Sequence, residues 1–83
     1  KLYLPKTKYY FGTTLQFIVR HTKRRIIIKN INLKNLNFFD EILLVGSGKG
    51  VVKLQSIPQV KWNSKSSIIF YELHDLYNSY ITQ

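Results

Sequence analysis

Three glycines within five residues constrain this chain more than any other feature, because Gly46, Gly48 and Gly50 directly follow an apolar run. The run covers residues 42–45, and the segment 40–45 that contains it predicts a strand that ends at the first glycine. Glycine has no Cβ, so a cluster of glycines indicates backbone that needs positive φ or a close approach to another group. Residues 51–57 then alternate in the pattern of a second strand. The cluster therefore predicts a tight corner between two strands.

Two segments have the spacing of amphipathic helices. The first follows Gly12, with Thr13 and Thr14 predicted as helix-capping residues. Its recurring positions are Leu15, Ile18, Val19 and Thr22. The basic residues 23–25 suit its C-terminal end, where cations meet the negative end of the helix dipole. The second helix closes the chain, and the residues that it places on one face are Ile69, Leu73, Leu76 and Tyr80.

The other elements are predicted strands and short connections. Residues 25–31 contain a run of isoleucines and predict a strand that is largely buried on both faces. Residues 2–4 form a strand that Pro5 closes, because proline has no N–H to donate to a ladder. Residues 33–39 predict a short polar helix or turn, and residues 58–62 a connection or a short edge strand. The order predicts a single α+β domain of 83 residues, with a mixed sheet, a helix after the Gly-Thr-Thr turn and a C-terminal helix.

The composition excludes several classes of site. The chain has no cysteine, so neither a disulfide nor a thiolate metal site is possible, and its two histidines, His21 and His74, show no ligand spacing. His74 and Asp75 are adjacent on the predicted helix and diverge by about 100°, which prevents an acid–base pair. No apolar run reaches the length of a membrane span. We expect a cytoplasmic protein with no metal centre and no membrane contact.

The net charge of +9 is unevenly distributed, since residues 1–34 hold nine Lys and Arg and no acid, and the remainder is neutral. One interpretation is a small basic nucleic-acid-binding domain with aromatic stacking platforms. Its contact residues would be Arg20, Lys23, Arg24, Arg25 and Lys29, with Tyr9, Tyr10 and Phe11. The other is compositional bias, because Phe, Tyr, Ile, Asn and Lys account for 37 of the 83 residues. Charge by itself is a weak indicator of function, so nucleic-acid binding is kept as the alternative function.

Two segments have the chemistry of anion sites. At Gly12-Thr13-Thr14 a helix begins, and the N–H groups of a first turn have no partner within the helix and attract anions. Plain capping is the alternative interpretation. At the glycine corner, the Ser47 hydroxyl and the N–H groups after it have the arrangement of an anion-binding nest, with a simple hairpin corner as the alternative. The corner is neither a Walker A loop, since glycine follows Lys49, nor a dinucleotide fingerprint, since a strand follows it.

Together these segments resemble a known family. Residues 40–54 (DEILLVGSGKGVVKL) are similar to a segment of class IV (fold-type-IV) pyridoxal-phosphate aminotransferases and aminodeoxychorismate lyases. Gly12-Thr13-Thr14 resembles the family's G-[IV]-[TM] helix start, and its separation of 34 residues from Gly46 is close to the family's spacing. Trp62, followed by Lys65-Ser66 and the closing helix, is similar to the family's C-terminal end. The resemblance covers essentially all 83 residues and implies part of the C-terminal domain of such an enzyme.

The resemblance assigns roles to individual residues. The phosphate of the cofactor, pyridoxal 5'-phosphate (PLP), would be bound by the helix start and the glycine corner, that is by Gly12, Thr13, Thr14, Gly46 and Ser47. Ser47 and Gly48 would also face the carboxylate of the substrate. The full-length parent, expected as a homodimer, would transfer an amino group from an amino acid to a 2-oxo acid, or eliminate pyruvate from aminodeoxychorismate. In both reactions the cofactor is the electron sink and the protein positions it.

The resemblance also implies what this sequence lacks. In the family, the lysine that binds the cofactor covalently and the carboxylate that partners the pyridine nitrogen lie upstream of the glycine–threonine helix start. We therefore expect this chain to be a C-terminal fragment that contains no catalytic residue and is inactive by itself. The sequence departs from the family at Lys49, where a small apolar residue is frequent, and at Lys53, where proline is frequent. We interpret Lys49 as an exposed loop residue and not as a substitute nucleophile.

Overall fold

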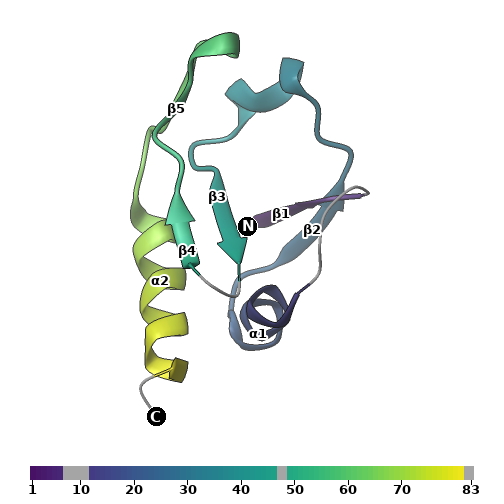
Figure 1. Cartoon of the computed structure of the whole chain (residues 1–83). Helices are drawn as coiled ribbons and strands as arrows, with labels where there is room; N and C mark the ends of the chain where they lie inside the picture. The colour runs from purple at the N-terminus through teal and green to yellow at the C-terminus, as the bar shows by residue number, and fades with distance from the viewer. Residues whose placement is uncertain (7–11, 47–48, 82–83) are drawn as a thin grey trace.

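A computed structural model describes residues 1–6, 12–46 and 49–81 of the chain, without the side chain of Tyr80. Its elements follow one another as shown in Figure 1. In chain order they are β1 (Leu2–Pro5), α1 (Thr13–His21), β2 (Ile26–Lys29), the short helix η1 (Leu33–Phe38), β3 (Leu43–Gly46), β4 (Gly50–Lys53), β5 (Ser56–Ile57), the short helix η2 (Pro58–Val60), β6 (Trp62–Asn63) and α2 (Ile68–Ile81). The α+β class, the helix after Gly12 and the C-terminal helix are confirmed.

The strands pair in three separate two-stranded sheets within the described residues. β1 and β2 are parallel, with Leu2 opposite Ile26, because α1 connects them as a crossover. β3 and β4 are antiparallel, with Gly46 opposite Gly50, as a tight corner requires. β5 and β6 form a third, antiparallel pair. Parallel and antiparallel pairing both occur, but the prediction of one mixed sheet is wrong, because no ladder among the described residues joins the three pairs.

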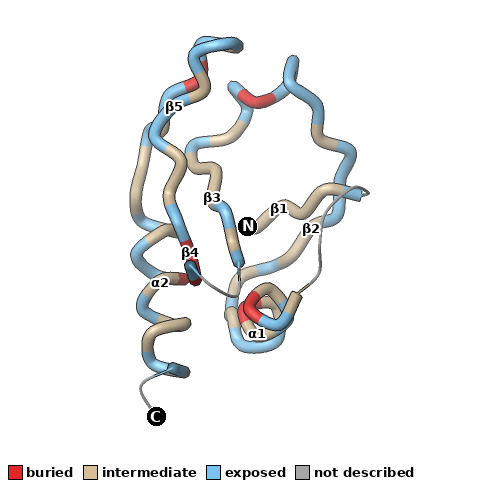
Figure 2. The backbone as a smooth tube through the Cα atoms, in the orientation of Figure 1, coloured by how far each residue is buried: buried red, intermediate tan, exposed pale blue. Residues whose placement is uncertain are grey.

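The main core lies where α1, β4 and α2 meet. Its buried members are Ile18, Val51 and Leu73, which are 2%, 3% and 4% exposed. Leu43 and Val45 of β3 pack against this cluster, so both strands of the antiparallel hairpin contribute to it. Burying an aliphatic side chain of this size contributes roughly 1.5–3 kcal/mol. The core therefore holds the hairpin between the two helices, and Figure 2 shows buried positions in α1, β4 and α2.

A second buried group lies at the opposite end of the molecule (Figure 2). Trp62 is 1% exposed, and its indole Nε1–H donates a hydrogen bond of 3.0 Å to the carbonyl oxygen of Phe39. Leu36 of η1 is also buried. This group fixes the segment around β6 against the segment that leads into β3.

The N-terminal end of α2 is bound by a carboxylate from another part of the chain. Glu41 accepts hydrogen bonds from the backbone N–H groups of Ile69 and Phe70, both at 2.9 Å, and from the Ser66 hydroxyl at 3.1 Å. A negative charge at this end of a helix satisfies unpaired donors and interacts favourably with the helix dipole. Glu41 thereby ties the chain just before β3 to the beginning of α2.

Several local predictions are wrong. The N-cap of α1 is Gly12, so Thr13 and Thr14 are the first helical residues and not the caps. The basic residues in the last turn are Arg20 and His21, because α1 ends before residue 23. The strand predicted for residues 25–31 spans only Ile26–Lys29, and it is not buried on both faces, since Ile28 is 59% exposed.

Candidate anion-binding site

The first predicted anion-binding segment is the beginning of α1. Gly12, the N-cap, has extended backbone angles, and its carbonyl accepts the first helical hydrogen bond, from Gln16 N at 3.0 Å. The N–H groups of Thr13, Thr14 and Leu15 precede that bond and therefore have no acceptor within the helix. The first turn carries no acidic residue, so no carboxylate of its own neutralises the positive end of the helix. Thr14 is buried, at 4% exposure.

The second predicted segment is the glycine corner between β3 and β4. Gly46 ends β3 and Gly50 begins β4 directly opposite it. Gly50 has φ +70°, in the left-handed region that L-residues with a Cβ avoid. At Gly46, no heavy atom of the described residues lies within 4 Å of the position that a Cβ would occupy. The predicted contacts of Ser47 and Gly48 lie outside the described residues.

Packing brings the elements that carry these two segments together. Ile18 of α1, Val45 of β3 and Val51 of β4 belong to one hydrophobic cluster. Figure 1 shows the C-terminal end of β3 directed towards α1. The elements adjoin, as one shared anion would require. The expectation that the Cα atoms of Thr14 and Ser47 lie within roughly 10 Å, about a phosphate and two hydrogen bonds across, involves an undescribed residue and stays a prediction.

The lysines near the corner have different surroundings. Lys49 is exposed, which agrees with its interpretation as a loop residue. Lys53, at the end of β4, donates a hydrogen bond to the hydroxyl of Ser67, just before α2. Lys53 is therefore engaged in holding β4 against the start of α2.

Sequence reasoning missed two residues through which the β3–β4 hairpin and the segment before it contact α2. Glu41 was recognised only as part of the strand segment, although its carboxylate caps α2. Tyr77 of α2 lies against Gly50, where its ring atoms Cε2 and Cδ2 would be 2.8 and 3.0 Å from an added Cβ. The acidic pair at residues 40–41 is the sequence signal that could have identified Glu41 as a capping carboxylate. The helical pattern of α2 indicates only a core-facing side and does not identify Tyr77 as the residue that contacts Gly50.

One of the cations predicted to contact nucleic acid is already paired within the protein. Arg24 forms a two-pronged ion pair with Glu72 of α2, with Nε–Oε2 at 2.7 Å and Nη2–Oε1 at 2.8 Å. The hydrogen bond from Arg24 holds the pKa of Glu72 below its ordinary value. Arg20, Lys23 and Arg25 are exposed. The predicted stacking residues Tyr9, Tyr10 and Phe11 lie outside the described residues.

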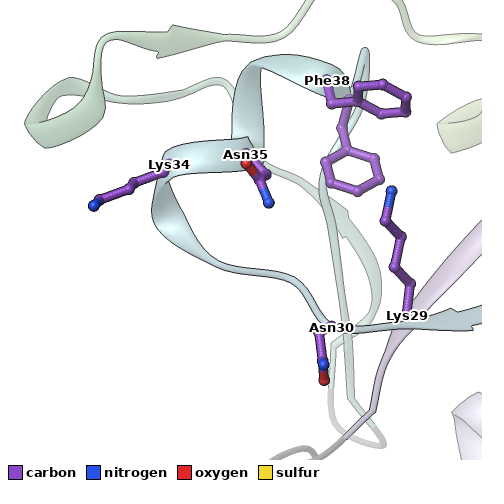
Figure 3. Close-up of a pocket in the computed structure, with 6 residues that line it drawn as sticks. Lys29, Asn30, Lys34, Asn35 and Phe38 are labelled. Carbon is purple, nitrogen blue, oxygen red and sulfur yellow. The ribbon is translucent and has the colours of Figure 1, made fainter.

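A shallow polar pocket of about 360 Å³ lies between the end of β2 and η1. It is lined by Lys29, Asn30, Lys34, Asn35, Phe38 and Phe39. The Lys29 ammonium lies 4.8 Å from the centroid of the Phe38 ring, within cation–π range. Figure 3 shows the side chains of Lys34 and Asn30 directed away from this centre. The pocket therefore lacks the convergent polar groups that a ligand site requires.

No helix among the described residues combines the length and the apolar character needed to cross a membrane. Comparisons with models of known protein families, with curated proteins and with solved structures find no match to this chain.

Proposed function

We propose that this chain supplies the phosphate-binding loops of a PLP-dependent enzyme of the class IV type, an aminotransferase or an aminodeoxychorismate lyase. The N–H groups at Thr13 and Thr14 and the Thr14 hydroxyl would bind the cofactor phosphate from one side. Gly46 and Ser47 would bind it from the other side, and Ser47 and Gly48 would face the substrate carboxylate. When bound in such an enzyme, PLP supplies an electron sink for reactions at the α-carbon of an amino acid.

One observation carries the proposal: α1 and β3, whose ends hold the two predicted phosphate segments, share the core around Ile18 and Val45. Two features of the described residues fit a phosphate. The first turn of α1 has donors ahead of the first helical bond and no acid to neutralise them. Among the described residues, no atom lies within 4 Å of the position where a side chain of Gly46 would stand, which agrees with a ligand approaching the backbone there.

The proposal assigns binding, and no proton transfer, to the residues of this chain. The lysine and the carboxylate that the resemblance requires for catalysis are not among its 83 residues. Phosphate contacts are made equally in the ground state and the transition state, so they do not by themselves accelerate a reaction. Their role would be to hold the cofactor in one position while other groups act.

The test is a calorimetric titration of the chain with PLP, alone and in the presence of inorganic phosphate. We expect PLP to bind and phosphate to compete with it. Thr14→Val should weaken binding by about tenfold or more, since a hydrogen bond to a charged group contributes roughly 1.5–3 kcal/mol. Thr22→Val, at the other end of α1, is the matched control and should leave the affinity unchanged. Equal affinity for both variants, or a lack of competition by phosphate, would refute the proposed site.

A second experiment tests the interpretation of Lys49. The chain is mixed with PLP, reduced with borohydride, and any covalent adduct is mapped by mass spectrometry. We expect no stoichiometric adduct at Lys49 and no turnover of an amino acid, because this lysine is an exposed turn residue. A site-specific adduct at Lys49 together with turnover would show that the chain is catalytic by itself.

A further inference from the structure

A row of aromatic rings reaches the surface at η1, which lies at the opposite end of the molecule from α1 (Figure 1). Phe38, the last residue of η1, is 70% exposed. Its ring contacts the ring of Phe39 edge-on, with the centroids 5.9 Å apart. The ring of Phe39 contacts that of Tyr3 in β1 in the same way, at 5.2 Å. The three rings thus form one connected row, and the ring at its end is open to solvent.

A lysine ammonium is held beside this row. The Nζ atom of Lys29 lies 4.8 Å from the centroid of the Phe38 ring and 5.9 Å from that of the Tyr3 ring. Both distances are within the range of cation–π attraction. Lys29 is nevertheless exposed, so its charge is available to a ligand. A charge that is already positioned loses less conformational freedom when it binds a phosphate.

The pocket at this surface has the charge of a polyanion site. Lys34 lines it together with Lys29, and the side-chain amides of Asn30 and Asn35 add hydrogen-bond donors and acceptors. No acidic side chain of the described residues lines it. Figure 3 shows the ammonium groups of the two lysines on opposite sides of Asn35. Cations that diverge in this way do not enclose a small anion, but a chain of phosphates that passes over the pocket can contact both.

Single-stranded nucleic acid is the ligand whose chemistry fits this combination. Its phosphates repeat along the chain, so each of two separated lysines can neutralise one. Its unpaired bases stack on exposed aromatic rings with little dependence on sequence. A duplex offers the same phosphates but keeps its bases stacked inside, so it gains nothing from the ring of Phe38. A mononucleotide offers a base but no second phosphate group along a chain.

We propose that Phe38, Lys29 and Lys34 form a binding surface for single-stranded nucleic acid, in which a base stacks on the Phe38 ring and backbone phosphates contact the two lysines. This surface is separate from the proposed PLP site, since none of the three residues belongs to the predicted phosphate segments. Among the described residues that the sequence suggested for nucleic-acid contact, only Lys29 lines this pocket.

The first experiment measures the affinity of the full chain for a labelled single strand of about 12 nucleotides, within the usual site sizes of such surfaces. Fluorescence anisotropy is recorded with RNA, with DNA and with a duplex of the same sequence, and at least one single strand should bind more tightly than the duplex. An unlabelled mononucleotide at equal nucleotide concentration should not displace the strand. Duplex binding as tight as single-strand binding, or displacement by the mononucleotide, would overturn the inference.

Variants of Phe38 test the stacking contact. Phe38→Ala should weaken single-strand binding by about tenfold or more, because the stacking of one base is lost. Phe38→Tyr keeps an aromatic ring and should retain the affinity of the original chain. Phe38→Leu keeps apolar volume without an aromatic face, and it should lose affinity as Phe38→Ala does, so it decides the question if Phe38→Ala does not fold. Equal affinities of the original chain and both non-aromatic variants would overturn the inference.

The salt dependence separates a contact at this surface from the effect of net charge. Lys34→Gln should reduce the slope of log affinity against log salt concentration by about 0.7, the share of one phosphate contact on a single strand. Lys23→Gln removes the same charge from an exposed lysine that does not line the pocket, and it should leave the slope nearly unchanged. Equal changes of slope in the two variants would show that only net charge attracts the strand and would contradict the proposed surface.

Discussion

Gly50 is the residue whose identity the backbone determines most directly. Its φ of +70° costs any other L-residue about 1–2 kcal/mol. The Tyr77 ring also occupies the space that a Cβ would enter, at 2.8 Å. At Gly46, only four positions earlier, no described atom lies within 4 Å of the Cβ position, and no positive φ is found. The two glycines therefore have different surroundings, a packed aromatic ring at Gly50 and no described contact at Gly46.

Substitution of these two glycines tests that difference. Gly50→Ala should destabilise the protein by about 2–4 kcal/mol, the sum of backbone strain and overpacking. Gly46→Ala should cost less than about 1 kcal/mol, since the added methyl group meets no atom of the described residues within 4 Å. In a Tyr77→Ala background, the cost of Gly50→Ala should fall to that of backbone strain alone. The free energies of unfolding of the three single variants and the double variant are measured by urea unfolding, followed by the fluorescence of Trp62, the single tryptophan. Equal costs at both glycines would contradict the difference described between them.

Two glutamates of this chain should contribute very differently to stability. Glu41 accepts three hydrogen bonds from the start of α2, and Glu41→Gln should cost about 1.5–3 kcal/mol because charged acceptors are lost. Glu72 lies on an open face of α2 and pairs with one arginine, so Glu72→Gln should cost less than about 1 kcal/mol. Chemical denaturation at neutral pH measures the free energy of unfolding of both variants. A larger effect at Glu72 would show that the N-terminal end of α2 is not held as described.

At the scale of elements, the helices could be predicted from sequence better than the strands. α1 and α2 have apolar residues at helical spacing, and Ile18 and Leu73 of that pattern are indeed buried. The isoleucine run gave a strand that is shorter and more exposed than predicted, because its partner β1 extends only over Leu2–Pro5. A hydrophobic pattern contains no information about the length of the partner strand. The predicted strand 51–57 is likewise divided, since β4 pairs with β3 and β5 pairs with β6.

The candidate site could be predicted only in part for the same reason. Gly12 and the glycine corner were identifiable because glycine has a distinctive conformational range. The residues that support the corner come from α2, more than twenty positions later in the chain. Tyr77 belongs to a helix whose repeating apolar residues predict a core-facing side but do not identify the segment against which that side packs. Its role depends on how α2 crosses the hairpin, which local sequence does not encode.

The ion pair between α2 and the segment before β2 predicts a pH dependence. The hydrogen bond from Arg24 lowers the pKa of Glu72 from its ordinary value of 4.5. A carboxylate with a depressed folded-state pKa adds stability above the unfolded-state pKa, and that stability is lost as pH falls through the folded-state pKa. Below pH 4.5, the stability of Glu72→Gln should therefore fall less steeply than that of the original chain. Unfolding curves recorded across pH at low and at high salt check this prediction. The difference in pH dependence between the variant and the original chain should shrink as salt rises, because the ion pair is exposed.

At the scale of the whole molecule, the described residues enclose an apolar cleft of about 760 Å³ to which β1, β2, β3 and both helices contribute. Leu43 and Val45 line it from β3, and Leu2 and Ile26 line it from the parallel pair. A chain of 83 residues buries a smaller share of its surface than a typical domain. An apolar surface of this kind predicts that the chain is poorly soluble in isolation.

The uneven charge of the molecule makes a separate prediction. A net charge of +9 attracts polyanions at low salt whatever the function. Arg24 is engaged with Glu72, so changing Arg24 and Arg25 together to alanine should alter the affinity for single-stranded DNA by no more than about threefold at 150 mM salt, well below the loss expected from removing two contacts of a true site. Fluorescence anisotropy with a labelled oligonucleotide measures the affinity of the original chain and of the double variant. Tight binding with a steep salt dependence that the double variant abolishes would favour the nucleic-acid function instead.

The most direct test of the central claim is a titration of the ¹⁵N-labelled chain with inorganic phosphate, followed through its backbone amide resonances. If one anion is held between the helix start and the glycine corner, the amides of Thr13 and Thr14 and those of residues 46–48 should shift together, with one dissociation constant. The exposed lysines elsewhere, such as Lys61 and Lys65, should shift weakly and without saturation. Shifts at only one of the two segments, or two different dissociation constants, would contradict a shared phosphate site.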